Sequence, residues 1–164
     1  MDNNIELSDE ELNKLVAERD IFYRQICSEH LEALPGVKSL LVDLRQNNLK
    51  VGLATSTSRG NIEFFLPKLG IYDYFDQIVA GTDVTCGKPD PEIYLKTCKK
   101  LDVKPINCVG IEDTEIGVNA LKNANMKSVA VTLTNRKEYD FSDADLVVKT
   151  LEEINFNMVK ELFY

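Results

Sequence analysis

Short apolar segments alternate with amphipathic segments along most of the chain, and this alternation limits the possible folds more than any other feature. Residues 49–54 and 107–111 are apolar runs of strand length, and each is followed by a segment whose apolar residues recur at helical spacing. Such an alternation predicts an α/β fold, with a parallel sheet and helices on both faces. The expected strands are Leu49–Ala54, Gln77–Thr82, Asn107–Ile111, Lys127–Leu133 and Asp145–Val148, and the expected helices are Ser8–Leu34, Val37–Asn47, Arg59–Leu69, Pro91–Leu101, Thr114–Asn125 and Leu151–Phe163.

The composition fits one domain, or one domain and a fragment of another, and argues against some classes of partner. The 164 residues are 44% hydrophobic, enough for a core, and no apolar stretch approaches the length of a membrane span. A net charge of −8 argues against nucleic acid and anionic membranes as partners, whereas local basic groups and a metal would still allow a phosphorylated metabolite to bind. The four cysteines lack metal-ligand spacing, so we expect reduced thiols in a cytoplasmic protein.

An acidic pair, Glu112 and Asp113, lies between the strand that begins at Asn107 and the helix that begins at Thr114. Ligands of open parallel sheets bind in the crevice beyond the carboxyl ends of the strands. Two adjacent carboxylates in that place need a positive partner, and Mg²⁺ is the usual one. The pair by itself is equally compatible with an acidic helix N-terminus that binds no metal.

Two further polar features fall at the same expected edge of the sheet. The hydroxyl residues 55–58 lead from a strand into a helix, where free backbone N–H groups make an anion site or simply a capped turn. Lys88 precedes a helix for which Asp90 is the expected N-cap and Pro91 the first residue. An isolated lysine is usually a solvated surface charge, but one held beside a phosphate site would act as a positioned point charge.

These features resemble motifs two, three and four of the haloacid dehalogenase superfamily, in that order along the chain. The segments LPGV, GLATSTSR, LPKLGIYDYFD, GKPDPEIYL and VGIEDTEIGVNAL resemble its β-phosphoglucomutase-like phosphatase branch. The resemblance extends from Leu34 to the C-terminus and implies a Rossmann-like α/β core in residues 34–164, with residues 1–33 as a remnant of a helical cap. It implies a phosphatase or phosphomutase that uses Mg²⁺ on a small phosphorylated metabolite, with a sugar phosphate as the expected class. The expectation for oligomeric state is a monomer for a complete protein, with association open to this shorter chain.

The resemblance also assigns roles by position. Thr55 and the backbone at Ser56 would hold the phosphoryl group that is transferred. Lys88 would neutralise charge between that phosphate and a nucleophilic carboxylate. Asp113, with help from Glu112, would bind Mg²⁺. The matches expected to contact the rest of the substrate are Thr57, Ser58 and Arg59.

One family feature has no counterpart at the expected place. These enzymes form an aspartyl-phosphate on the first Asp of an Asp-x-Asp motif at the end of their first strand, and the second Asp acts as general acid and base. The only Asp-x-Asp in this chain is Asp143-Ala144-Asp145, which precedes a strand. The family places its first strand between those ending at Thr55 and Asp113, so we expect two open strand edges there.

Three hypotheses follow for the function. The first is a haloacid dehalogenase-type phosphatase or phosphomutase. The second is a catalytically inactive fragment or pseudoenzyme that retains the phosphate and Mg²⁺ pocket. The third is a signalling receiver domain, which also arranges acids, a hydroxyl and a lysine around Mg²⁺. The order of the motifs argues against the third, because receivers place the acidic pair first and here it comes last.

Overall fold

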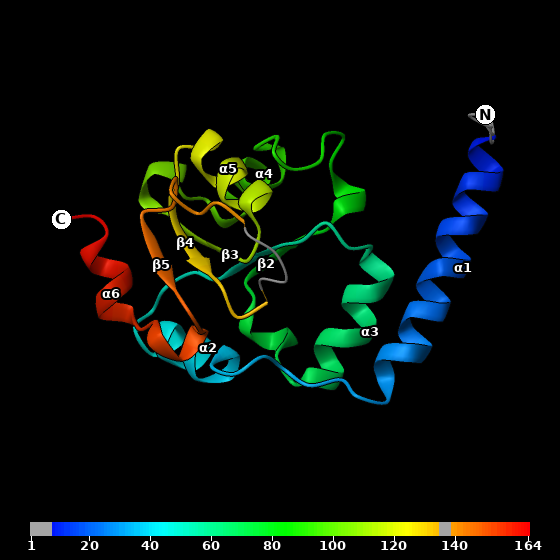
Figure 1. Ribbon diagram of the computed structural model, residues 1–164, viewed down its shortest axis with the longest axis horizontal. Coiled ribbons are helices and arrows are strands. Elements are labelled where there is room, and N and C mark those ends of the chain that lie inside the picture. The colour runs from blue at the N-terminus through cyan, green and yellow to red at the C-terminus, as the bar shows by residue number, and fades with distance from the viewer. Residues whose placement is uncertain (1–7, 135–138) are drawn as a thin grey trace.

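A computed structural model describes residues 8–134 and 139–164 (Figure 1). It has the predicted α/β fold, with parallel strands and helices on both faces. The helices are α1 (Asp9–Ser28), α2 (Val37–Gln46), α3 (Arg59–Leu69), α4 (Glu92–Leu101), α5 (Glu115–Asn123) and α6 (Phe156–Glu161). The strands are β1 (Gly52–Ala54), β2 (Gln77–Val79), β3 (Val109–Glu112), β4 (Lys127–Val131) and β5 (Leu146–Val148).

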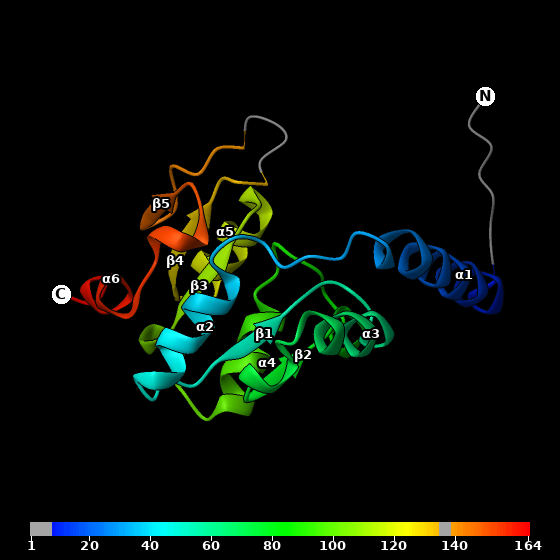
Figure 2. The same ribbon diagram turned by 90° about the horizontal axis from the view of Figure 1, so that it is seen from below.

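The strands form two separate parallel sheets. β1 pairs with β2, and β3, β4 and β5 pair in that order. Seen from below, β1 and β2 lie beyond β3 on the side away from β4 and β5 (Figure 2). The division between β1 and β3 is the place where the family resemblance puts a further strand.

Helices bridge the two sheets on both faces. On one face, neighbouring residues of α2 pack in different directions: Leu41 joins the core cluster of Val51 and Ile62, whereas Leu40 joins that of Val129. On the other face, α4 and α5 share a buried cluster that includes β2. The apolar faces of three helices therefore hold together sheets that share no strand pairing.

The edges of β1 and β3 that face one another carry backbone groups that form no strand pairing within the described residues. Thr55 N–H donates to Val79 and Val51 accepts from Asp76, so the odd-numbered residues of this strand face β2. In a parallel strand, alternate residues direct their N–H and C=O groups to opposite sides. The groups of Gly52 and Ala54 therefore face β3. By the same alternation, Cys108 faces β4, because its carbonyl accepts from Lys127, and the following odd-numbered residues face β1.

Helix α1 projects from the rest of the molecule beside α3 (Figures 1 and 2). Its predicted capping box is present, since Ser8 accepts from Glu11 N–H and Glu11 in turn accepts from Ser8 N–H. None of the helices in the described ranges is long and apolar enough to cross a membrane. The predicted buried face is wrong for the described structure, because α1 packs mainly on α3 and leaves most of its apolar side chains exposed. The exposed side chains are Leu12, Leu15, Val16, Ile21, Phe22, Tyr23 and Ile26.

Several predicted element ends are also wrong. The first helix stops at Ser28, and the chain then runs in extended form toward α2 instead of remaining helical to Leu34. The last predicted helix is divided, because Asn155 caps a new helix by accepting from Met158 N–H. Pro91 is the N-cap of α4 rather than its first residue, although the Asp90 carboxylate still accepts from Glu92 N–H.

Asp76 ties the start of β2 to β1, and we predict a pH-dependent loss of stability in Asp76→Asn. Its carboxylate accepts from Val51 N–H at 2.8 Å and from the Arg45 guanidinium at 2.6 Å. Both bonds lower the pKa of Asp76, and the bond from the Val51 backbone has the larger effect. A depressed folded-state pKa contributes stability that is present above the unfolded pKa and is lost as the pH falls through the folded pKa.

Asp76→Asn should therefore lower the free energy of unfolding at pH 7 by about 1 kcal/mol, a modest figure because the side chain is partly exposed. The stability of the variant should also fall less steeply than that of the unchanged protein as the pH falls below about 4. Urea unfolding at several pH values measures both effects, with Asp73→Asn as the control at an exposed aspartate nearby. Parallel stability–pH curves for the Asp76 variant and the unchanged protein would contradict this assignment.

Candidate active site

A pocket of about 630 Å³ opens between the two sheets, at the carboxyl ends of β1 and β3. This is where open α/β sheets bind their ligands. The structure brings Thr55, Ser56, Lys88, Glu112 and Asp113 to its wall. The other lining residues are Leu34, Ala54, Gly87, Ile111, Thr114, Ile116, Val131, Thr134, Tyr139 and Leu151.

Lys88 and Glu112 form an ion pair that is largely shielded from solvent. Lys88 Nζ lies 2.5 Å from Glu112 Oε1, and the two side chains are 14% and 10% exposed. Tyr94 of α4 donates its O–H to the same carboxylate oxygen, and its ring centroid lies 5.1 Å from Lys88 Nζ. Burial, and then the charge of Glu112, raises the pKa of Tyr94, so the phenol remains a donor. Lys88 is therefore a positioned charge and not a solvated surface lysine.

Gly117, in the first turn of α5, leaves the space that the second oxygen of Glu112 occupies. A β-carbon at Gly117 would overlap Glu112 Oε2. Thr114 is the N-cap of this helix, and its side chain accepts from Gly117 N–H at 3.1 Å. The side chain of Glu112 is thus fixed from both sides, by Lys88 and Tyr94 on one oxygen and by α5 at the other.

Asp113 is exposed, and its Oδ2 accepts a hydrogen bond from the Thr134 hydroxyl at 2.8 Å. Among the lining residues that the structure describes, two carboxylates and one ammonium give a net charge of −1, so an added cation would favour the binding of an anionic phosphate. Mg²⁺ in proteins is held by one or two carboxylates, with water and substrate phosphate completing its shell. Asp113 fits that donor set, and so does Glu112 Oε2, because the bonds from Lys88 and Tyr94 are both made to Oε1.

Thr55 and Ser56 form the turn after β1. Thr55 N–H continues the ladder to Val79, while its Oγ1 accepts from Thr57 N–H at 3.3 Å. The turn is closely packed, because a β-carbon at Gly81 would overlap the Ser56 carbonyl. The hydroxyls of both residues are thereby placed on the β1 side of the pocket, across from the acidic pair on β3.

The three residues that follow do not line this pocket. Thr57 contacts Asn61 through its hydroxyl. Ser58 caps α3 and donates its O–H to the Asp20 carboxylate of α1. Arg59 pairs with Asp83. Their assignment to substrate contact stays a prediction.

The pattern of the sequence alone does not single out Tyr94, Gly117 or Thr134. Tyr94 occupies an apolar position of an amphipathic helix, and only its buried hydroxyl, which needs a partner, hints at another role. Gly117 follows the acidic pair closely, and a glycine inside a helical pattern is a signal of close packing. Thr134 carries no signal of its own.

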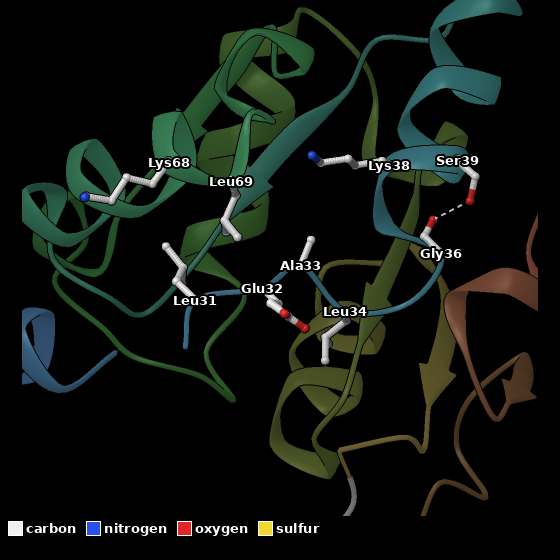
Figure 3. Close-up of a pocket in the computed structure, with 9 residues that line it drawn as sticks. All are labelled: Leu31, Glu32, Ala33, Leu34, Gly36, Lys38, Ser39, Lys68 and Leu69. Carbon is white, nitrogen blue, oxygen red and sulfur yellow. Dashed lines mark hydrogen bonds between the residues drawn. The ribbon is translucent and has the colours of Figure 1, made fainter. Parts of the chain in front are cut away.

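A second pocket, of about 510 Å³, lies beneath the connection between α1 and α2 (Figure 3). Leu34 lines both pockets, so this connection separates them. In the close-up, Leu31 and Leu69 point toward one another, whereas the Lys68 side chain points outward. The Lys68 ammonium lies 4.8 Å from the centroid of the Phe64 ring. Among the described residues, the charged side chains that line this second pocket form no ion pair like that of Lys88 and Glu112.

Comparison with known proteins places the chain in a family. Residues 3–131 match the haloacid dehalogenase-like hydrolase family. The chain is 38% identical to β-phosphoglucomutase of Bacillus subtilis over 130 residues, which cover 79% of this chain and 55% of that protein. It is 37% identical to phosphorylated carbohydrates phosphatase of Thermotoga maritima over 142 residues, which cover 85% of this chain and 65% of that protein.

A solved structure agrees with these matches. The crystal structure of β-phosphoglucomutase from Clostridium difficile superposes with a TM-score of 0.83 at 37% identity, covering 96% of this chain and 69% of that one. The chain thus spans between about half and two thirds of the length of the two curated relatives named above. Sequence and fold agree that the chain belongs to the haloacid dehalogenase-like hydrolase family.

Proposed function

We propose that this chain carries the phosphate and Mg²⁺ pocket of a phosphatase or phosphomutase that acts on a small phosphorylated metabolite, with a sugar phosphate as the substrate class. The observation that supports this most is the shielded Lys88–Glu112 pair, which lies beside Asp113 and across the pocket from Thr55. A lysine at such a site neutralises phosphate charge, while exposed carboxylate oxygens supply ligands for a hard cation. The relatives named above are described as acting on phosphorylated carbohydrates or as a phosphoglucomutase.

The residues have separate roles in this proposal. The Thr55 hydroxyl and the backbone at Ser56 bind the phosphoryl oxygens from the β1 side. Lys88 neutralises charge that develops on the transferring group, and Tyr94 with Glu112 positions the ammonium. Asp113 and Glu112 would hold Mg²⁺, which when bound shields the phosphate charge and polarises a phosphoryl oxygen.

A second candidate function is binding without turnover, and one observation favours it for the 164 residues themselves. The single Asp-x-Asp lies away from the pocket, and both of its aspartates make structural contacts. Asp145 accepts from Ser128 N–H at 2.8 Å and pairs with Lys127, while Asp143 pairs with Lys122. Neither aspartate lines the candidate active site.

The division into domains and the compartment are part of the same proposal. Residues 1–33 are a remnant of the cap and residues 34–164 form the core, which the projection of α1 away from the strands supports. All four cysteines are free thiols, which fits a reducing compartment such as the cytoplasm.

Asp113→Asn tests the metal site. It removes one negative charge from the proposed Mg²⁺ ligands but keeps the hydrogen bond that Thr134 donates. We expect Mg²⁺ affinity, measured by titration calorimetry with inorganic phosphate present, to fall by about tenfold or more. Asp143→Asn, at an exposed carboxylate outside the pocket, is the control and should leave the affinity unchanged. Equal Mg²⁺ affinities for the unchanged protein and both variants would indicate that the acidic pair only caps the helix and binds no metal.

A further inference from the structure

Two cysteines from different elements lie side by side away from the candidate active site. Cys98, in α4, is buried, and Cys108, which directly precedes β3, is partly exposed. Their sulfur atoms are 3.7 Å apart. Cys108 is the C-cap of the 3₁₀ turn Pro105–Asn107, and this turn packs against α4.

The surroundings of the two thiols differ. Cys98 donates its S–H toward Cys108 and also lies 3.9 Å from the sulfur of Met126. Cys108 in its thiol form donates to the Lys104 carbonyl at 3.3 Å. The hydrogen bond from Cys98 lowers the pKa of Cys108, and the same bond together with burial raises the pKa of Cys98. Cys108 is thus the more accessible thiol and the more readily ionised one, with a second thiol within reach.

We propose that Cys98 and Cys108 are a reversible thiol modification site, in which Cys108 reacts first with a small-molecule disulfide such as oxidised glutathione and Cys98 resolves the adduct. A disulfide needs a sulfur separation of about 2.05 Å, so the two sulfur atoms must approach from 3.7 Å. Cys108 lies at the end of a short turn, where a change of side-chain rotamer moves its sulfur without moving a helix.

The chemistry balances in two exchange steps. The Cys108 thiolate attacks one sulfur of oxidised glutathione, which forms a mixed disulfide and releases one glutathione thiolate. Cys98 gives up its proton, attacks Cys108 Sγ and displaces the second glutathione. Two protein thiols are thereby oxidised to one disulfide, and one glutathione disulfide is reduced to two glutathione molecules.

A Cys98–Cys108 disulfide would join two segments that are already in contact beside the candidate active site. Tyr94 lies one helical turn before Cys98 in α4, and Glu112 ends the strand that follows Cys108. Tyr94 and Glu112 are joined by a hydrogen bond. Oxidation would therefore join the same two elements at a second point.

The test equilibrates the 164-residue chain in glutathione buffers of increasing oxidised fraction, then maps its disulfides by mass spectrometry without reduction. We expect a Cys98–Cys108 link that dithiothreitol reverses. Cys86→Ala, at an exposed cysteine elsewhere, should form the same link. Cys98→Ala should instead retain glutathione on Cys108, and Cys108→Ala should leave Cys98 unmodified while the chain is folded, which circular dichroism checks.

A second measurement needs no substitution. A trivalent phenylarsenical bridges two thiols that are close together, so its addition to the unchanged protein should join Cys98 to Cys108 and prevent the disulfide. The proposal is overturned if the unchanged protein accumulates glutathione on Cys108 without forming the link. It is equally overturned if the arsenical fails to bridge this pair, or if Cys98 reacts as fast in Cys108→Ala as Cys86 does.

Discussion

Replacement of Lys88 by alanine should lower turnover by about tenfold or more, equivalent to about 1.4 kcal/mol, in a protein with a complete pocket. Such a protein is a chimera in which the part of B. subtilis β-phosphoglucomutase that precedes its shared region is joined to this chain. The physical reason is electrostatic, because Lys88 is the one cationic side chain among the described residues that line the pocket and is only 14% exposed. A shielded charge acts on the phosphoryl group with little screening by water.

The Lys88 experiment must separate catalysis from folding. Removal of Lys88 leaves the Glu112 carboxylate with Tyr94 as its remaining side-chain donor, and loss of one partner of a buried ion pair costs about 3–5 kcal/mol. The double variant Lys88→Ala/Glu112→Gln removes the stranded charge, so it should recover much of the stability but none of the turnover. Lys122→Ala, which breaks an exposed pair with Asp143, is the control. A change within about twofold for Lys88→Ala would leave the lysine with a purely structural part.

The strand–helix alternation predicts most of the fold. The apolar runs place every strand, because burial on both faces of a parallel sheet leaves a strong signal. The runs overestimate strand length: Leu49–Ala54 contains a strand of only Gly52–Ala54. The first residues of that run connect α2 to the strand, and an apolar residue in a connection can also be buried, as Val51 is.

Amphipathic spacing says less about what covers a helix. The apolar stripe of α1 predicts a buried face, but a stripe shows only that a helix has an apolar side. In the described structure α3 covers a small part of it, and Phe22 remains 64% exposed. The length of α1 is overestimated for a related reason, since helical spacing continues to Leu31 while the chain turns away at Ser28 to reach α2.

The candidate site is predictable where chemistry and topology coincide. Thr55, Lys88 and Asp113 follow from strand ends and from a helix start, which topology alone brings together. The Lys88–Glu112 pair and its Tyr94 donor do not, because they depend on side-chain directions across three elements. Ser58 and Arg59 contact Asp20 and Asp83 in the described structure, and their assignment to substrate contact stays a prediction.

The other large effect we predict is that the 164-residue chain, assayed alone, has no enzymatic turnover. Lys88, Thr55 and the acidic pair prepare a phosphoryl group for attack, but a separate group must attack it. The two carboxylates of the pocket are committed: Glu112 binds Lys88 and Tyr94, and both Glu112 and Asp113 serve the proposed metal. The Asp-x-Asp segment lies elsewhere, with Asp145 tied to Ser128.

The open strand edges of β1 and β3 are a second reason to expect no turnover by the chain alone. Thr55 and Asp113 stand on sheets that share no strand pairing in the described ranges, so their spacing depends on helix packing and on side-chain contacts such as the Lys88–Glu112 pair. Displacement of a reacting group by about 1 Å can cost about 10²-fold in rate. Even water attack assisted by a metal would therefore lack both a positioned phosphate and a general acid and base, a group that contributes about 10²–10⁴-fold.

The assay compares the chain alone with the chimera described above, each with Mg²⁺ against a panel of sugar phosphates and an aryl phosphate. We expect turnover in the chimera and none above the buffer rate in the chain alone. Turnover of about 1–10 s⁻¹ by the chain alone, lost in Lys88→Ala, would overturn this prediction. Such a result would require a nucleophile within these residues, and the carboxylates nearest Lys88 would then be the first to replace, Glu112 by glutamine and Asp113 by asparagine. Turnover by the chain alone that survives in Lys88→Ala would instead indicate a contaminating phosphatase, because the proposed chemistry has no route that avoids the lysine.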